Sequence, residues 1–340
     1  MDNSSSKHWP KISVNILGFN EKHQLEKSIS SIFKQDYPNF EVLYIDNAST
    51  DGSEEFVRER FPNVKILQTG ENRHYGPAHN KGLANSDSEL VCLLNTDLEL
   101  APNYLSLAVE ALLKDERIAG VQGKTLRPKI EGQPQLIDGT GLTIDRMRIV
   151  RDRGQLEIDN GQYDVPGEVF AICGSNPVYR RKALQEVAID GEIIDEDITA
   201  FFDDSDLGWR LRHQGWKLWY EPKAISYHER GVGQSPGGYK HIFALVKFRK
   251  QFSARTKQLA WKNKIYLTLK NDFGKTLNRD FFRILLREIA TLGFIIIFET
   301  KTLAVIPLMM KQMPKILHKR KLIKSRSVLG DNNIDRFIIK

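Results

Sequence analysis

Three carboxylates stand within four residues at Asp203, Asp204 and Asp206, directly before the helical pattern of Leu207–Gln214. Acidic side chains in the first turn of a helix interact favourably with its dipole, so one of the three has that structural role. Three exceed what capping needs, and their mutual repulsion raises at least one pKa. A carboxyl group with a raised pKa suits a general base that removes a proton from a hydroxyl group.

A second set of residues could hold a hard cation. Asn95-Thr96-Asp97 directly follows the apolar strand predicted over Leu90–Leu94, and the Asp97 carboxylate can act as a ligand. His228 ends another predicted strand and could be a second ligand, although a lone histidine there is as often structural. A diphosphate would complete the shell of Mg²⁺ or Mn²⁺, and the ion would neutralise a departing phosphate.

Two other polar turns follow predicted strands, Gly18-Phe19-Asn20 after Ile12–Leu17 and Asp46–Ser53 after Phe40–Ile45. A carboxylate at a strand end can accept hydrogen bonds from a nucleotide base or ribose. The alternative is a turn that only caps the next helix. The early helices open without Gly-x-Gly-x-x-Gly or a Walker sequence, which argues against NAD and P-loop nucleotides.

The elements that position these turns alternate between strand and helix over the first hundred residues, which indicates a doubly wound, mostly parallel sheet with ligands at the carboxyl ends of its strands. Beyond a helix at Pro102–Asp115, we expect loop and short strands over Val121–Pro166, and then a strand at Val169–Cys173. The remaining elements of this body are predicted as a helix at Arg181–Glu186 and strands at Lys217–Tyr220 and Ala224–Tyr227.

With these turns in this order, the chain resembles the family 2 glycosyltransferases of the GT-A fold, in particular the rhamnosyltransferase-like branch that builds bacterial surface polysaccharides. The resemblance spans roughly Lys11–Gly231 and depends on several motifs in the right order. They are Tyr37-Pro-Asn-Phe-Glu-Val, Asp46-Asn-Ala-Ser-Thr-Asp-Gly-Ser, Asn80-Lys-Gly82, Leu93-Leu-Asn-Thr-Asp97, Gly174 through Arg181, the acidic run before Leu207–Gly215, and Tyr227-His228.

The resemblance implies a role for each matching residue. Asp203 stands where the family usually has Glu, and Asn95 replaces the first carboxylate of the metal-binding Asp-x-Asp. The implied roles are catalytic base for Asp204; donor nucleotide binding for Asn20, Asp46 and Asn80; metal and diphosphate binding for Asp97 and His228; and support of the acceptor side for Asp203, Asp206 and Gly174.

The implied reaction inverts the anomeric carbon in a single displacement, moving one sugar from a nucleotide-diphosphate sugar, with dTDP-rhamnose implied by the branch. The sequence lacks the Gln-x-x-Arg-Trp motif of processive synthases; the nearest match is Arg212-His-Gln-Gly-Trp216. Two alternatives remain open at this stage: a catalytically silent relative that binds nucleotide sugar or glycan, and a nucleotidyltransferase, whose amino-terminal loop should be Gly-rich.

Charge is distributed unevenly along the chain, whose net charge is +7. The segment Lys240–Arg326 holds 21 of the 50 Lys and Arg but only 4 of the 43 Asp and Glu. Its most apolar stretch, Thr291–Met310, is interrupted by Glu299, Lys301 and Pro307, which favours a helix lying in a membrane interface over one spanning it. The alternative is that these helices simply pack on the body.

These features divide the chain into a catalytic domain at residues 10–231 and a basic amphipathic helical region at 232–340. We expect the second region to bind an anionic membrane surface, and not nucleic acid, because no recognition module accompanies the charge. The start of the chain lacks the apolar stretch of a signal peptide, and Cys92 and Cys173 form no disulfide pattern. The expected location is therefore the cytoplasmic face of the membrane, with a polyprenyl-diphosphate-linked saccharide as acceptor, as the resemblance implies.

Overall fold

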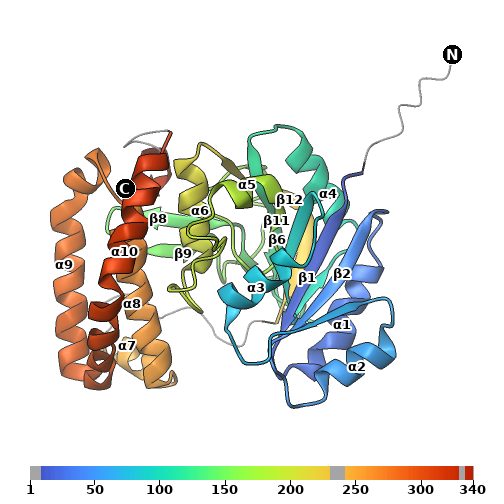
Figure 1. Cartoon of the computed structure of the whole chain (residues 1–340), viewed down its shortest axis with the longest axis horizontal. Helices are drawn as coiled ribbons and strands as arrows, with labels where there is room; N and C mark the ends of the chain where they lie inside the picture. The colour runs from blue at the N-terminus through green and yellow to red at the C-terminus, as the bar shows by residue number, and fades with distance from the viewer. Residues whose placement is uncertain (1–8, 230–241, 329–333, 340) are drawn as a thin grey trace.

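A mixed sheet forms the body of the molecule in the computed structural model, which describes residues 9–229, 242–328 and 334–339 (Figure 1). Its strands run in the order β10-β12-β6-β11-β4-β1-β2-β3, with β5 paired to β12 and β7 to β6. The strands are β1 (Ile12–Gly18), β2 (Phe40–Asp46), β3 (Lys65–Gln68), β4 (Leu90–Asn95), β5 (Leu98–Leu100), β6 (Ile118–Leu126), β7 (Ile137–Gly139), β10 (Gly167–Glu168), β11 (Val178–Arg180) and β12 (Lys217–His228). A small second sheet joins β8 (Leu142–Asp145), β9 (Val150–Asp152) and β13 (Ile338–Ile339).

Helices cover both faces of the main sheet. The bounds are α1 (Lys22–Phe33), α2 (Ser53–Arg60), α3 (Tyr75–Ala84), α4 (Tyr104–Leu113), α5 (Arg181–Glu186) and α6 (Asp203–His213). Successive side chains of β4 point to opposite faces, so Cys92 packs in the cluster of α1 and α4, whereas Val91 and Leu93 pack in that of α5 and α6. Burial on both faces explains why β4 is an uninterrupted apolar run.

The predicted α/β class with a mostly parallel sheet is confirmed. The pairs β1 with β2, β1 with β4, β2 with β3 and β6 with β12 are all parallel. The short strand β11 lies antiparallel between β4 and β6 and was not predicted. The two strands expected at Lys217–Tyr220 and Ala224–Tyr227 are one strand, β12, with an irregularity between Glu221 and Ile225.

Two predictions between β4 and α5 differ from the structure. The loop and short strands expected over Val121–Pro166 are present as β7, β8 and β9, but the first residues, Val121–Leu126, belong to the nine-residue strand β6, in which every residue is buried. Val169–Cys173, expected to be a strand, is a mostly buried segment with a bend at Phe170, and its one described bridge joins Ala171 to Leu142. An apolar run reports burial, and here the burial comes from packing on Trp209 and its neighbours in α6 rather than from strand pairing.

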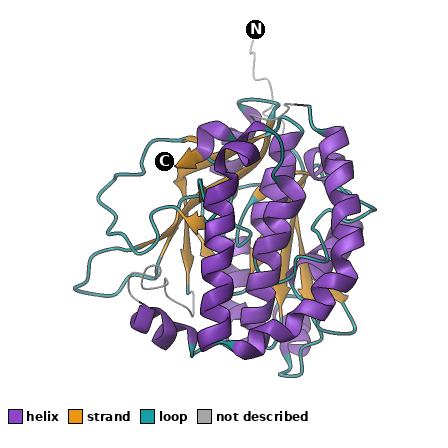
Figure 2. Ribbon diagram, turned by 90° about the vertical axis from the view of Figure 1, so that its left-hand side faces the viewer, coloured by secondary structure: helices purple, strands orange, loops and turns teal. Residues whose placement is uncertain are grey.

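The carboxyl-terminal part of the chain forms a helical layer beside α6. It consists of α7 (Ile242–Arg249), α8 (Ala254–Asn271), α9 (Lys275–Phe298), a 3-10 helix (Thr300–Val305) and α10 (Ile306–Arg326), followed by a short 3-10 turn (Asp335–Phe337). Figure 2 shows α8, α9 and α10 side by side, and Figure 1 places α9 on the outside of the molecule. The predicted domain boundary at residues 231 and 232 lies outside the described residues.

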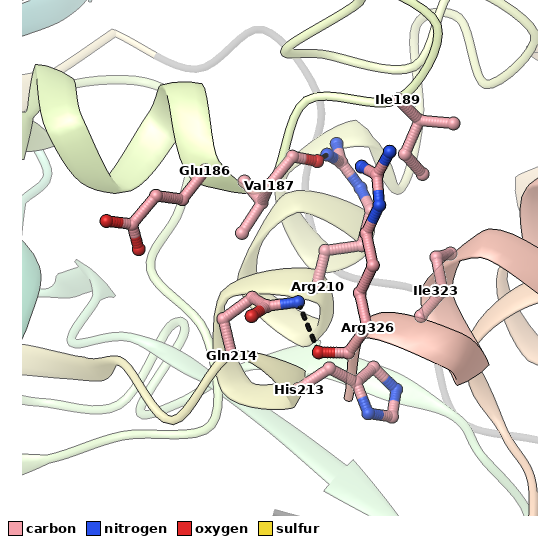
Figure 3. Close-up of a pocket in the computed structure, with 8 residues that line it drawn as sticks. All are labelled: Glu186, Val187, Ile189, Arg210, His213, Gln214, Ile323 and Arg326. Atoms are coloured by element: carbon pink, nitrogen blue, oxygen red, sulfur yellow. Dashed lines mark hydrogen bonds between the residues drawn. The ribbon is translucent and has the colours of Figure 1, made fainter. Parts of the chain in front are cut away.

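Within the described residues, no single helix is long and apolar enough to cross a membrane, although α9 and the helical segment Thr300–Arg326 meet that criterion as a pair bent by 116°. The layer is joined closely to the body. Figure 3 shows a small cavity where the end of α10 meets α6, in which the Gln214 side chain donates a 2.7 Å hydrogen bond to the Arg326 carbonyl. The cavity has a volume of about 10 Å³, so the two surfaces fit together with little space between them.

Candidate active site

The carboxyl ends of the central parallel strands meet at one edge of the sheet. Gly18 at the end of β1 pairs with Asp46 of β2, and Leu17 pairs with Asn95 of β4. A cavity of about 210 Å³ opens at this edge. Its lining residues come from the β1–α1 loop, the β2–α2 loop, the start of α3 and the end of β4: Leu17, Gly18, Phe19, Glu21, Asn47, His74, Tyr75, Asn95 and Asp97.

The predicted donor loops lie against one another beside this cavity. Asn20, with a φ of 55°, accepts a 2.7 Å hydrogen bond from the Thr50 backbone N–H through its Oδ1. Asp46 is 1% exposed and accepts from the Ser49 N–H at 3.3 Å and the Tyr44 hydroxyl at 3.3 Å. The buried Asp46 carboxylate therefore stabilises the turn, whereas its neighbour Asn47 lines the cavity.

Asp97 and His228, predicted as a pair, are in direct contact. His228 Nε2 lies 2.9 Å from Asp97 Oδ2, and Nδ1 lies 2.8 Å from Asp138 Oδ2. Arg127 Nε lies 2.9 Å from the other oxygen of Asp138. Burial lowers the pKa of His228, but the hydrogen bonds to Asp138 and Asp97 outweigh this and raise it to about 9.

The residues around Asp97 fit a divalent cation. Asp97 Oδ1 is buried and has no hydrogen-bond partner among the residues that the structure describes, which is unusual for a carboxylate oxygen. Glu21 lies nearby, accepts a hydrogen bond from the Thr96 hydroxyl, and has a pKa raised by burial and by the charge of Asp97. His228 would have to lose its proton to bind the ion, while Asp138 would fix its ring orientation.

The acidic run forms the first turn of α6, as predicted. Burial, followed by the charge of Asp204, raises the pKa of Asp203 to about 7. Burial and the charge of Asp152 raise the pKa of Asp204, whose Oδ1 accepts from the Ser205 N–H at 2.6 Å. Asp206 differs from both, because ion pairs with Lys270 and Arg210 keep its pKa low in spite of full burial.

Tyr75 connects the cavity with the acidic turn. Its ring lines the cavity together with Asp97, and its hydroxyl donates to the Gly174 carbonyl. The Gly174 N–H donates to Asp204 Oδ2 at 3.3 Å, and a Cβ atom on Gly174 would come within 3.0 Å of the Tyr75 hydroxyl. Gly174 therefore permits the close approach that joins Asp204 to the cavity, and its supporting role on the acceptor side stays a prediction.

Asn80 is not brought to the cavity. Its side-chain amide exchanges hydrogen bonds of 2.8 and 2.9 Å with the Ile194 backbone and donates to Glu196 at 3.1 Å, so it ties α3 to the segment before α6. Another acidic group, Glu192, Asp195 and Asp197, has carboxylate oxygens close enough to hold a metal ion. The Lys319 ammonium group already lies among all three, so this group is neutralised by the helical layer.

Sequence reasoning missed Glu21, Tyr75 and Asp138. Glu21 directly follows Asn20 and could have been found as a polar residue of the same turn. Asp138 lies in the short strand β7, far in sequence from both Asp97 and His228, and no local spacing connects it to them.

Comparison with solved structures identifies the fold as GT-A. GalNAc-T7, solved with UDP, GalNAc and Mn²⁺, superposes with a TM-score of 0.58 at 16% identity, over 79% of this chain and 49% of that one. The mannosyltransferase PcManGT of Pyrobaculum calidifontis, solved with GDP-Man and Mn²⁺, gives a TM-score of 0.53 at 18% identity, over 95% and 76% of the two chains.

Sequence comparison gives the family. Residues 13–188, more than half of the chain, match Glycosyl transferase family 2, and the chain belongs to that family. It is therefore a glycosyltransferase. An N-acetylglucosaminyl-diphospho-decaprenol L-rhamnosyltransferase of Mycobacterium tuberculosis is 27% identical over 74% of this chain and 86% of that protein. A poly-beta-1,6-N-acetyl-D-glucosamine synthase of Staphylococcus epidermidis is 25% identical over 64% of this chain, which spans about half of the synthase.

Proposed function

We propose that this glycosyltransferase moves a single sugar from a nucleotide-diphosphate sugar to a hydroxyl group of a saccharide, with inversion at the anomeric carbon. The observation that carries the proposal is the linkage of two acidic sites through Tyr75 and Gly174. Asp97 and His228 form a cation-binding side of the site, and Asp204 is joined to it from a separate element. A single displacement needs one base on the acceptor side and a stabilised leaving group on the other.

In this mechanism Asp204 accepts the proton of the acceptor hydroxyl as its oxygen attacks the anomeric carbon. The raised pKa of Asp204 strengthens it as a base, and hydrogen bonds from Ser205 and Gly174 fix the direction of the carboxylate. The bond between the sugar and the nucleoside diphosphate breaks as the new bond forms. The chain has no need of a covalent nucleophile for this step.

The donor would lie over the carboxyl ends of β1, β2 and β4, with Asn47 beside the nucleotide and with Asn20 and Asp46 holding the turns next to it. Asp97 and His228 would hold Mg²⁺ or Mn²⁺, with Asp138 behind His228. When bound, the ion would supply positive charge to the diphosphate leaving group. The need for this charge is clear, since Glu21, Asp97, Asp203 and Asp204 make the site acidic.

The acceptor proposed here is a polyprenyl-diphosphate-linked saccharide, in a pathway of polysaccharide biosynthesis. The similarity to the mycobacterial rhamnosyltransferase supports a lipid-linked acceptor and a rhamnosyl donor such as dTDP-rhamnose. A lipid-linked acceptor requires the enzyme to work at a membrane surface. The helical layer supports this, because the outer face of α9 exposes large apolar side chains along its length: Phe282, Leu286, Ile289, Ile296 and Ile297.

The experiment that tests the reaction is a panel of dTDP-, UDP- and GDP-sugars with Mg²⁺ or Mn²⁺. A bound donor stabilises the folded chain, and its slow hydrolysis reports the leaving-group chemistry. We expect one donor class to raise the melting temperature and to be hydrolysed, and a chelator to abolish the hydrolysis. Stabilisation by nucleoside triphosphates, with release of diphosphate, would instead support a nucleotidyltransferase. Binding of a nucleotide sugar without any hydrolysis or transfer would support a catalytically silent relative.

A further inference from the structure

Helix α8 of the helical layer carries four buried polar side chains whose partners lie in the segment that leads into the acidic turn and in that turn itself. Lys262, Asn263, Lys270 and Asn271 are each at most 2% exposed. Asn263 and Lys270 are seven residues apart, about two turns, and lie on the same side of the helix, with Lys262 and Asn271 to either side of them. Buried amides and ammonium groups need partners, and here the partners belong to residues 195–206.

Asn263 contacts the residues directly before the acidic turn. Its Nδ2 group donates to the Thr199 carbonyl at 2.7 Å and to the Phe201 carbonyl at 3.1 Å. Its Oδ1 atom is buried without a hydrogen-bond partner among the described residues, so the two donated bonds fix the orientation of the amide. One side chain therefore clamps two carbonyl groups of the same turn.

The clamped turn has an unfavourable backbone. Ala200 has a φ of 72° and Phe202 has a φ of 66°, and neither is glycine. Such a residue is strained and persists only where the surroundings hold it in place. The two carbonyl groups that Asn263 holds belong to Thr199 and Phe201, which directly precede Ala200 and Phe202.

Asp203 and Asp204 follow this turn without an intervening residue. Phe202 is the amino-terminal cap of α6, and its carbonyl accepts the Asp206 N–H at 2.9 Å. Beyond the two carboxylates, Asp206 Oδ1 is held by Asn271 and Lys270, both at 2.7 Å. The acidic turn is thus fixed at both ends by α8, before it by Asn263 and after it by Lys270 and Asn271.

We propose that Asn263 is a positioning residue for sugar transfer: its amide holds the strained turn Thr199–Phe202 and thereby aims Asp204 at the acceptor hydroxyl. The helical layer then completes the catalytic site in addition to any contact with a membrane. This inference rests on the proposed function, since Asp204 must be the base. It assigns no contact with the substrate to Asn263 itself.

The test is Asn263→Asp, which keeps the size of the side chain but replaces the donating group with an oxygen that repels both carbonyl groups. We expect kcat for transfer to fall by about 10- to 100-fold, as for a small misplacement of a catalytic group. Donor affinity should stay unchanged, because Asn263 bonds to Thr199 and Phe201, and neither of these residues lines the donor cavity. Asn63→Asp, in the exposed turn before β3, is the matched control and should behave as wild type.

A change at Ala200 distinguishes positioning from general stability. Ala200→Gly in the Asn263→Asp background should restore at least part of kcat, because glycine adopts a positive φ without strain. Ala200→Val alone should lower kcat, since a β-branched residue is worse in this conformation, and it keeps the test available if Asn263→Asp does not fold. Ala200 is exposed, so neither change disturbs a core.

Asp204→Asn is measured in the same series to separate the two proposals. Loss of transfer in Asp204→Asn with a wild-type kcat in Asn263→Asp would overturn the positioning role alone. A wild-type kcat in Asp204→Asn would overturn the proposed base. A fall in kcat of Asn263→Asp that only follows the fraction of unfolded protein, without rescue by Ala200→Gly, would also reject the positioning role.

Discussion

Asp203 and Asp204 share a crowded acidic turn in which ionising both carboxyl groups is costly. Burial and the charge of Asp204 raise the pKa of Asp203 to about 7, and the pKa of Asp204 is raised as well. Two carboxyl groups this close titrate as a pair. As the pH falls, Asp204 is therefore protonated, and inactive as a base, at a higher pH than an isolated aspartate would be.

The pH dependence of kcat/KM tests the raised pKa of Asp204, since it reports the free enzyme. Because the base must be deprotonated, activity should decline as the pH falls through the raised pKa of Asp204, at a higher pH than for an ordinary aspartate. Asp152→Asn removes the charge that, after burial, raises the pKa of Asp204, and it should move this decline in activity to lower pH. A decline in wild type only near pH ~4, the ordinary range of an aspartate, or the same decline in Asp152→Asn, would show that the pKa of Asp204 is not raised in this way.

Asp138 carries a second prediction at this scale. It contacts His228 Nδ1, the ring nitrogen that faces away from Asp97, as supporting carboxylates do in metal sites. Asp138→Ala should therefore weaken Mn²⁺ binding by about 10- to 100-fold. Asp138→Asn keeps an acceptor and should weaken binding less. Titration of free Mn²⁺ by electron paramagnetic resonance measures both variants without a turnover assay. Equal affinity in wild type and Asp138→Ala would remove the supporting role.

The site could be predicted from the sequence only where residues sit next to a strand end or a helix start. Asp97 and Asp204 carry such local signals. Asp138 and Asn263 do not, because each acts through a contact with an element distant in sequence. Asn80 carries a family motif, but the motif gives no information about its hydrogen bonds to Ile194.

At the scale of elements, prediction succeeded for segments with a clear hydrophobic periodicity. It failed for apolar segments that are buried without pairing as strands, and for a paired strand whose sequence is not apolar. The predicted strands Ile12–Leu17, Phe40–Ile45 and Leu90–Leu94 match β1, β2 and β4 to within one residue at the carboxyl end. In β6, Gly120, Gly123 and Lys124 interrupt the apolar pattern. Added Cβ atoms at the two glycines would meet Tyr179 and the Ala224 carbonyl, so close packing requires glycine inside this strand.

The outer face of α9 makes the membrane proposal testable. Ile289 and Ile297 are 58% and 70% exposed, and burying each in lipid is worth about 1.5–3 kcal/mol. The double variant Ile289→Asp and Ile297→Asp should therefore weaken binding to phosphatidylglycerol vesicles by at least about 100-fold. Co-sedimentation measures the binding.

The control for this experiment places the same substitutions on exposed apolar residues of the body. Leu113 in α4 is 44% exposed and Val165 is 80% exposed, so Leu113→Asp with Val165→Asp adds equal charge elsewhere. This control should bind vesicles like wild type. Equal loss in both double variants would mean that charge alone, and not the apolar face of α9, determines the binding.

At the scale of the whole molecule, the helical layer and the body are joined by buried charge. Lys270 contacts both Asp195 and Asp206, and none of the three side chains is more than 2% exposed. The last strand, β13, adds to the sheet of β8 and β9. The two predicted regions, 10–231 and 232–340, should therefore unfold together.

Calorimetry of the full chain should show one cooperative transition. Truncation after Gly238 removes Lys270 and Lys319, and loss of one partner of a buried ion pair costs about 3–5 kcal/mol. We expect the truncated chain to lose cooperative unfolding and to aggregate. Two separate transitions in the full chain, or a truncated chain with an unchanged melting temperature, would show that the body folds independently.

The most direct test of the central claim is the rate of sugar transfer by Asp204→Asn, with donor affinity measured on the same preparation. The assay uses the donor identified by the panel and a synthetic polyprenyl-diphosphate-linked saccharide, and Asp87→Asn, in the exposed turn at the opposite end of β4, is the control. Removal of a general base predicts a loss of about 10²- to 10⁴-fold in transfer, with donor affinity retained. Transfer by Asp204→Asn at the wild-type rate would contradict the account.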